Sequence, residues 1–341
     1  MNKVKIDSHT IGSGHPCFVI AEIGSNHDCN IEQAMKLIDV AAWAGADAVK
    51  FQSFRAHTLN APNDSDYEIL RTIELPYEWH GMLAKHCKER KIVFLSTPFD
   101  FDAVESLEQV GVPAYKIASG DITYFSLLEK VASTEKPVII STGKTDMEDT
   151  KNAIAHLEKH GSKNIILLHC VAVYPTPPSE LNLSVIKTME ETFNIPVGLS
   201  DHTLDPFVPA LAVCHGAKVI EKHITTDNSL PGPDHSYALT ADQFKLMVKY
   251  IRTAETAYGT GIKELSTSEK AIAFTGRRAI FAAETLQPGT VLSYQNIVCL
   301  RPQMTTENLP ASVFDKIVGM RIKHEVKQYM PITVEDISLS E

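Results

Sequence analysis

One pattern recurs eight times before residue 260: a short apolar or β-branched run, then a longer segment of helical periodicity. The runs that we predict to be strands are Phe18–Gly24, Ala48–Phe54, Val93–Phe99, Tyr115–Gly120, Val138–Gly143, Asn164–Cys170, Val197–His202 and Val219–Thr225. Strands this apolar are covered on both faces, which is typical of parallel sheets. Eight βα units of about 30 residues favour an α/β fold, a closed (β/α)8 TIM barrel. An open doubly wound sheet is the alternative.

The helical half of the pattern is clearest in Ile31–Ala44. Its apolar residues fall on one face: Ile31, Ala34, Met35, Ile38, Ala41 and Ala42. Asn30 followed by Gln33, and Thr240 followed by Gln243, resemble the capping boxes that begin helices. These signals predict helix starts at residues 31 and 241.

The chain of 341 residues is longer than a typical barrel of about 250. We predict a TIM-barrel catalytic domain over residues 1–260, a polar linker over 261–276 and a small β-rich domain over 277–341. The short strand-like runs and the turn that mark the last part are Ala279–Ala282, Leu286–Gly289, Ile297–Leu300 and Val318–Ile322. A module of this size holds little core of its own, so we expect it to pack on the barrel or on a second subunit.

Composition restricts the partners and the compartment. A net charge of −10, without a basic stripe, argues against nucleic acid as a partner. The six cysteines show no C-x-x-C spacing and are expected to be reduced thiols. Residues 1–8 carry charges where a secretory signal would be apolar, and no apolar run reaches the length of about 20 residues that a membrane helix needs. We therefore expect a cytoplasmic protein without a membrane partner.

Polar side chains collect at the carboxyl ends of the predicted strands, where TIM barrels place their functional groups. They are Glu22, Asn26, His27, Lys50, Gln52, Thr97, Lys116, Ser119, Ser141, Thr142, Tyr174, Ser200, Asp201, His202, Glu221 and His223. Side chains alternate along a strand, so Lys50 shares a face with Gln52. In the same way Ser200 shares a face with His202, and Glu221 with His223. Buried lysines and glutamates are rarely left unpaired, which implies a ligand or a network inside the barrel.

The two lysines predict an anion site. A single lysine such as Lys116 can end in solvent, but Lys50 and Lys116 on two strands of one barrel favour a bound anion. Ser141 and Thr142 can cap the next helix, and this role is compatible with phosphate binding, because helix N-termini bind anions through free backbone N–H groups.

His202 and His223 end neighbouring strands and are predicted to face inward, which favours a metal site open to water and substrate. Zinc, iron, copper, nickel and manganese all remain compatible with two imidazoles. The run Ser200-Asp201-His202 cannot form a hydrolytic triad, because adjacent strand residues point to opposite faces. The remaining histidines, including His169 and His215, are expected to be structural.

Several ordered motifs resemble the sialic acid (N-acetylneuraminate) synthase family. They are Phe18-Val-Ile-Ala-Glu-Ile-Gly-Ser-Asn-His27, Val49-Lys-Phe-Gln52, Ser96-Thr-Pro-Phe99, Tyr115-Lys-Ile-Ala-Ser-Gly120, Ser141-Thr-Gly143, Gly198-Leu-Ser-Asp-His-Thr203 and Pro231-Gly-Pro-Asp234. The C-terminal module, with Arg301-Pro302, resembles that family's antifreeze-like (SAF) domain. The resemblance implies a transferase that condenses phosphoenolpyruvate with an N-acetylated amino-sugar aldehyde, of the N-acetylmannosamine type, to a nine-carbon 2-keto acid and phosphate.

The resemblance also implies roles for residues. Those expected to hold phosphoenolpyruvate are Lys50, Thr97, Lys116, Ser119, Ser141 and Ser200. His202 and His223 would bind a divalent ion, Mn²⁺ or Mg²⁺, and Glu22 is the candidate for activating water. The other candidate substrate-binding residues are Gln52, Asp121, Tyr174, Glu221, Asp234 and Arg301, of which Arg301 would reach the sugar site of the partner in a domain-swapped homodimer.

Two positions depart from the family pattern. Residue 172 is Ala where many members have Asn or Ser, and residue 121 is Asp where Glu is frequent. The sugar therefore stays open, and the alternatives are a legionaminic or pseudaminic acid synthase or an enzyme that uses the sugar phosphate. Two more distant alternatives are a metal-dependent barrel hydrolase, which should carry an H-x-H pair on an early strand, and a non-catalytic sugar-binding module.

Overall fold

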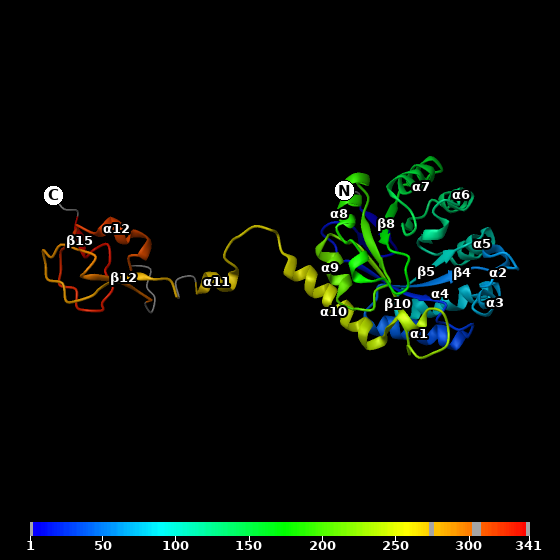
Figure 1. Cartoon of the computed structure of the whole chain (residues 1–341), viewed down its shortest axis with the longest axis horizontal. Helices are drawn as coiled ribbons and strands as arrows, with labels where there is room; N and C mark the ends of the chain where they lie inside the picture. The colour runs from blue at the N-terminus through cyan, green and yellow to red at the C-terminus, as the bar shows by residue number, and fades with distance from the viewer. Residues whose placement is uncertain (1–2, 273–275, 302–307, 339–341) are drawn as a thin grey trace. The chain divides into compact units, whose positions relative to one another are not determined.

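The computed structural model describes residues 3–272, 276–301 and 308–338. The chain forms two compact units, residues 1–260 and 261–341 (Figure 1). Within these described ranges, no helix combines the length and apolarity that crossing a membrane requires.

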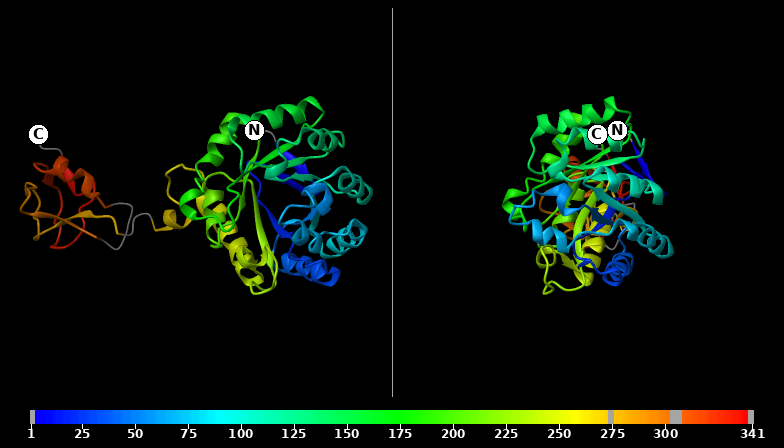
Figure 2. Two further views of the ribbon diagram at one scale, coloured as in Figure 1. Left: turned by 45° about the vertical axis from the view of Figure 1, so that its right-hand side comes forward. Right: turned by 90° about the vertical axis from the view of Figure 1, so that its right-hand side faces the viewer.

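The first unit is a (β/α)8 TIM barrel, with its helices arranged around the strands (Figure 2). Its strands are β3 (Phe18–Gly24), β4 (Ala48–Ser53), β5 (Val93–Pro98), β6 (Tyr115–Ile117), β7 (Val138–Ser141), β8 (Ile165–Cys170), β9 (Val197–Asp201) and β10 (Val219–Thr225). Parallel pairing runs in the order β5-β4-β3-β10-β9-β8-β7-β6, and the end strands β5 and β6 contact each other. A short strand, β11 (Leu239–Thr240), pairs with β10. The predicted barrel is confirmed.

The helices of this unit are α1 (Ile31–Ala44), α2 (Ala56–Leu59), α3 (Tyr67–Thr72), α4 (His80–Arg90), α5 (Phe101–Val110), α6 (Phe125–Ala132), α7 (Met147–Lys159), α8 (Val185–Phe193), α9 (Val208–Cys214) and α10 (Ala241–Tyr258). Single 3₁₀ turns are η1 (Tyr77–Trp79), η2 (Ser119–Asp121), η3 (Pro178–Glu180) and η4 (His235–Tyr237). Asn30 caps α1 as predicted, but the Gln33 amide donates to Thr226 instead of completing a capping box. Thr240 and Gln243 do form the predicted box at α10.

Strand β6 is shorter than the predicted Tyr115–Gly120. Its pairing with β7 ends at Ile117, and the backbone then turns into η2, where the Asp121 N–H donates to the Ala118 carbonyl. The turn places Ser119 beside the end of β7, where its Oγ accepts a hydrogen bond from the Gly143 N–H at 2.9 Å. The end of β6 is therefore a loop that belongs to the mouth of the barrel.

A hairpin that was not predicted lies at the N-terminus, where β1 (Val4–Ile6) pairs antiparallel with β2 (His9–Ile11). Its buried apolar residues share one core cluster with residues from the first positions of several barrel strands. The members of this cluster include Val4, Ile6, Ile11, Phe18, Ala48, Val93 and Val219. The hairpin therefore covers the end of the barrel opposite the predicted site.

The second unit has a separate small core, which includes Ile280, Leu292, Ile322 and Ile332. Its elements are α11 (Thr267–Ala271), β12 (Ala279–Ala282), β13 (Ile297–Leu300), η5 (Ala311–Val313), α12 (Phe314–Ile317), β14 (Arg321–Ile322) and β15 (Ile337–Ser338). Strands β12 and β13 pair antiparallel, as do β14 and β15. The polar segment before them contains α11, whose N-terminus has a Ser266–Glu269 capping box.

Candidate active site

A cavity of about 220 Å³ lies at the carboxyl ends of the barrel strands. The predicted site residues that line it are Glu22, Lys50, Gln52, Thr97, Lys116, Ser119, Ser141, Tyr174, Ser200, His202, Glu221 and His223. Asp121, Asp234 and Arg301 do not line it. The alternation of side chains along β4, β9 and β10 explains why these groups meet, because each strand presents every second residue to the interior.

The floor of the cavity is a buried network around Lys50. The Lys50 Nζ lies 2.6 Å from Glu22 Oε2 and donates to Thr97 Oγ1 at 3.0 Å. The Gln52 amide donates to Glu22 Oε1 at 2.8 Å. Burial opposes a charge on Lys50, but the carboxylates of Glu22 and Glu221 outweigh it and raise the pKa of the lysine.

Glu221 joins the two lysines. Its carboxylate lies 3.3 Å from the Lys116 Nζ and 3.8 Å from the Lys50 Nζ, and it accepts a hydrogen bond from Ser200 Oγ at 2.9 Å. Burial disfavours the carboxylate, yet both lysines and the serine overcome this and lower the pKa of Glu221. For Lys116, burial dominates over Glu221 and lowers the pKa. The cavity therefore holds two lysines paired with two glutamates.

His202 and His223 lie beside this network, with ring centroids 5.5 Å apart. The His202 Nδ1 lies 3.4 Å from the Val171 carbonyl, which can only accept, so Nδ1 carries the proton and Nε2 keeps its lone pair. Burial, reinforced by His223, lowers the pKa of His202 to about 3, so the ring is neutral at physiological pH. The His223 Nδ1 is buried without a hydrogen-bond partner and lies 3.9 Å from Asp234 Oδ2.

Asp234 lies on the loop after β10, next to His223. Its carboxylate accepts hydrogen bonds from the Ser25 N–H and hydroxyl at 2.9 Å and from the Tyr237 hydroxyl. Burial opposes its charge, but His223 and these donors lower its pKa. Only glycine fits next to it, because a Cβ at Gly24 would lie 2.5 Å from Asp234 Oδ2 and the backbone there has φ +55°.

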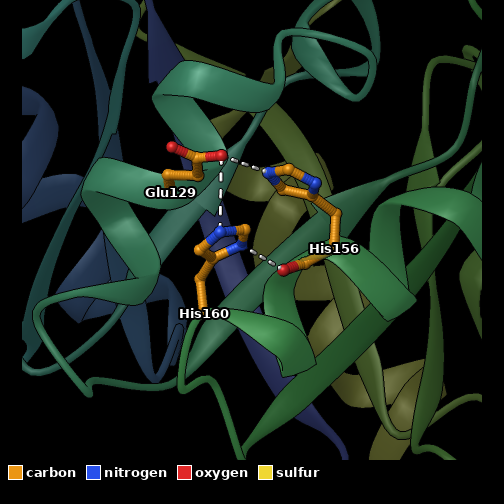
Figure 3. Close-up of side chains that lie close together, drawn as sticks. All are labelled: Glu129, His156 and His160. Atoms are coloured by element: carbon orange, nitrogen blue, oxygen red, sulfur yellow. Dashed lines mark hydrogen bonds and ion pairs between the residues drawn. The ribbon is translucent and has the colours of Figure 1, made fainter.

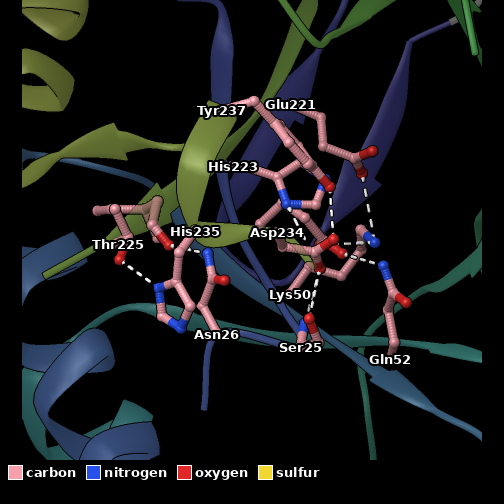
Figure 4. Close-up of polar contacts among 12 residues, drawn as sticks. Ser25, Asn26, Lys50, Gln52, Glu221, His223, Thr225, Asp234, His235 and Tyr237 are labelled. Atoms are coloured by element: carbon pink, nitrogen blue, oxygen red, sulfur yellow. Dashed lines mark hydrogen bonds and ion pairs between the residues drawn. The ribbon is translucent and has the colours of Figure 1, made fainter. Parts of the chain in front are cut away.

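The loop that carries Asp234 is fixed by the next residue. His235 is fully buried, and its ring nitrogens lie 2.7 Å from Thr225 Oγ1 and 3.0 Å from Asp28 Oδ1. Figure 4 shows His235 and Thr225 beside Asp234 and its partners Ser25 and Tyr237. This network holds the loop on the end of β10.

Asp201 faces away from the cavity, as strand alternation predicts. Its Oδ2 lies 2.6 Å from the Lys222 Nζ on the neighbouring strand, and its carboxylate also accepts from the N–H and the hydroxyl of Thr203. Ser200 and His202 line the cavity on the other side of the strand. The exclusion of a Ser-Asp-His triad therefore agrees with the structure.

Besides Asp234, two predicted residues do not line the cavity, and one charged lining residue was not predicted. Asp121 is half-buried in η2, and burial raises its pKa to about 6. Arg301 is exposed in the second unit, while its neighbour Pro302 lies outside the described residues. Lys144, which follows Gly143 at the end of β7, lines the cavity although no sequence motif indicated it.

The model of the NeuB family matches residues 37–263. This chain belongs to the NeuB family. Among its NeuB relatives, the N,N'-diacetyllegionaminic acid synthase of Legionella pneumophila is 40% identical over 329 residues, which is 91% of this chain and 92% of the relative. The spore coat polysaccharide biosynthesis protein SpsE of Bacillus subtilis is 37% identical over 368 residues, which is 100% of this chain and 99% of SpsE. The predicted family is confirmed.

A solved structure supports the same assignment. The N-acetylneuraminic acid (sialic acid) synthetase of Leptospira borgpetersenii, in complex with citrate, superimposes with a TM-score of 0.76 at 33% identity, covering 80% of this chain and 95% of that protein. The chain is therefore an enzyme of the NeuB family, and its relatives include proteins named as synthases of N,N'-diacetyllegionaminic acid and N-acetylneuraminic acid.

Proposed function

We propose that this enzyme condenses phosphoenolpyruvate with an N-acetylated amino-sugar aldehyde, of the N-acetylmannosamine type, to form a nine-carbon 2-keto acid and phosphate. The observation that carries the proposal is a single cavity in which two buried lysines with surrounding hydroxyls lie directly beside two inward-facing histidines. The first group suits an anionic enol phosphate, and the second suits the carbonyl group with which it reacts.

Phosphoenolpyruvate would bind along the lysines and the hydroxyl groups. Ser141 Oγ is buried without a hydrogen-bond partner, so it is free to donate to a phosphate or carboxylate oxygen. Because Glu22 and Glu221 already balance Lys50 and Lys116, the network alone offers no net positive charge. Lys144 at the rim, together with the divalent ion, would supply the positive charge that the substrate needs.

The two histidines fit a divalent metal ion. His202 keeps the lone pair of Nε2, and the Nδ1 of His223 faces Asp234, which would leave the Nε2 of that ring for the ion. We propose Mn²⁺ or Mg²⁺ as the ion, which when bound would polarise the aldehyde carbonyl. Asp234 lies close enough to His223 to orient the ring.

In the proposed reaction, the enol carbon of phosphoenolpyruvate attacks the aldehyde carbon and water adds to the former enol-phosphate carbon. The resulting hemiketal phosphate then loses phosphate by C–O cleavage. Glu22 would take the proton from water, since Lys50 and Gln52 fix its carboxylate at the floor of the cavity. The lysines and serines hold the phosphate while its bond to carbon breaks.

Gln52, Tyr174 and Asp234 would face the sugar, with Asp121 and Glu221 nearby. Arg301 of one protomer would complete the site of its partner in a domain-swapped homodimer, through a C-terminal SAF domain that excludes water. We place this enzyme in the cytoplasm. The name of the Legionella pneumophila relative favours one further substrate class, the deoxygenated diacetamido sugars that lead to legionaminic acid.

The test is free phosphate release by the purified chain with phosphoenolpyruvate, Mn²⁺ and a panel of amino sugars. The panel contains N-acetylmannosamine, its 6-phosphate and diacetamido sugars of the legionaminic and pseudaminic series. We expect release only when both substrates and the ion are present, and loss of release in His202→Ala and His223→Ala. Absence of release with every sugar would contradict the proposal, and release without a sugar would indicate a phosphatase.

A further inference from the structure

Away from the cavity, between α6 and α7, lies a cluster of side chains of the types that bind metal ions. Glu129 comes from α6, His156 from the last turn of α7, and His160 directly follows that helix. Figure 3 shows the two imidazoles converging on one carboxylate. The three residues each offer a ligand atom, and these atoms all lie within 4.8 Å of one another.

The spacing matches the coordination shell of a small ion. Glu129 Oε1 lies 3.1 Å from His156 Nε2 and 3.4 Å from His160 Nε2. Ligands bound tetrahedrally at about 2.0–2.1 Å from zinc lie roughly 3.3–3.4 Å from one another. Both measured distances are close to this separation.

The hydrogen bonds leave the ligand nitrogens available. His160 Nδ1 lies 2.8 Å from the His156 carbonyl, which can only accept, so this nitrogen carries the proton and Nε2 of the neutral ring has a lone pair. The His156 Nε2 is buried and has no hydrogen-bond partner, although the Glu129 carboxylate is 3.1 Å away. The two atoms are therefore neighbours without pointing at each other, which is the relation between two ligands of one ion.

The surroundings favour a cation. The site lies at the C-terminal end of α7, where the helix dipole is negative. Phe125 stacks on His156 with centroids 4.6 Å apart and restrains the ring. The Glu129 side chain is 49% exposed, which leaves room for water as a further ligand.

We propose that Glu129, His156 and His160 form a second metal site, which takes Zn²⁺ or another transition ion that prefers imidazole and fastens α6 to α7. The C-terminal ends of the barrel helices lie toward the end of the barrel opposite the active site, which is the end associated with stability. The ion there stabilises the fold and takes no part in catalysis.

The experiment measures binding of Zn²⁺ to the tag-free full chain by calorimetry and its effect on the midpoint of thermal unfolding. The variant His202→Ala/His223→Ala serves as background, so that the proposed active-site ligands do not contribute. We expect one equivalent of Zn²⁺ to bind to this background and to raise the midpoint by several degrees. Adding His156→Gln/His160→Gln should weaken binding by at least about 100-fold, since loss of even outer-shell partners costs about 10–100-fold.

The matched control is His86→Gln, because His86 also pairs with a carboxylate, that of Asp39, but without a second histidine. We expect this variant to retain zinc binding. In the otherwise unchanged chain, His156→Gln/His160→Gln should leave phosphate release unaltered. Equal Zn²⁺ affinity with and without the histidine pair would overturn the proposal. The absence of Zn²⁺ binding to the background variant would also overturn it, and would indicate that the histidines and Glu129 only share a proton. Neither result bears on the proposed synthase activity.

Discussion

Replacing Lys222 with Met should strongly destabilise the barrel, because it removes one partner of a buried ion pair. The Lys222 Nζ lies 2.6 Å from Asp201 Oδ2, and both side chains are at most 1% exposed. The ammonium also donates to the carbonyl of Thr203. The substitution leaves the Asp201 carboxylate buried with only its two hydrogen bonds from Thr203.

The size of the effect follows from burial. Removing one partner of a buried ion pair costs about 3–5 kcal/mol, because the remaining charge loses its compensation. Lys187 on α8 provides the control: its Nζ lies 3.7 Å from Glu191 Oε1, and the two side chains are 69% and 67% exposed. Lys187→Met should cost less than about 1 kcal/mol, because solvent screens this pair.

The assay is urea unfolding followed by tryptophan fluorescence. Both tryptophans of the chain, Trp43 and Trp79, lie in the barrel, so the signal reports on that unit alone. The double variant Lys222→Met/Asp201→Asn should recover a large part of the lost free energy of unfolding, because no charge stays buried. A cost for Lys222→Met no larger than that for Lys187→Met would refute the reasoning.

Three further substitutions test the site. Burial raises the pKa of Asp121 to about 6, so the ionised carboxylate destabilises the folded state at pH values above the pKa of the unfolded chain. Asp121→Asn should therefore be more stable than wild type at pH 7–8. The difference in thermal midpoint between the two proteins should disappear as the pH falls below about 4. Lys144→Ala should raise the KM for phosphoenolpyruvate by about 10-fold or more with little change in kcat, because it removes a charge-assisted contact at the rim of the cavity. An unchanged KM would exclude Lys144 from substrate binding. Gly24→Ala should lower kcat by at least about 10-fold, because the added Cβ displaces the Asp234 carboxylate from its place beside His223. Full activity of this variant would show that the carboxylate does not orient the His223 ring.

Strand periodicity was the most reliable guide to the interior of the barrel. An alternation of two residues is enough to place Ser200 and His202 on one face and Asp201 on the other, and the structure agrees. The same rule brings Glu221 and His223 into the cavity. These positions could be predicted because a buried parallel strand leaves its side chains no other directions.

Features that depend on loops and on contacts between elements could not be predicted in this way. Lys144 has φ +59° in a turn, where no periodicity applies. The pairing of Lys50 with Glu22 depends on the register of β3 against β4, which cannot be predicted from the sequence of either strand alone. His160 and Glu129 meet only because α6 packs on α7. Their spacing in the sequence does not indicate this contact, so the scattered histidines were expected to be structural.

The N-terminal hairpin has a consequence for the order in which the barrel is assembled. Its apolar residues, such as Ile6, precede every barrel strand in the chain, but their buried cluster includes Ile166 of β8 and Val219 of β10. The hairpin cannot be fully buried until those strands exist, so contacts separated by more than 200 residues must form together. Long-range contacts of this kind slow folding and make the final step cooperative. The hairpin precedes the barrel strands in the chain but is completed last, so the barrel acquires its closed end only once nearly all of its strands are in place.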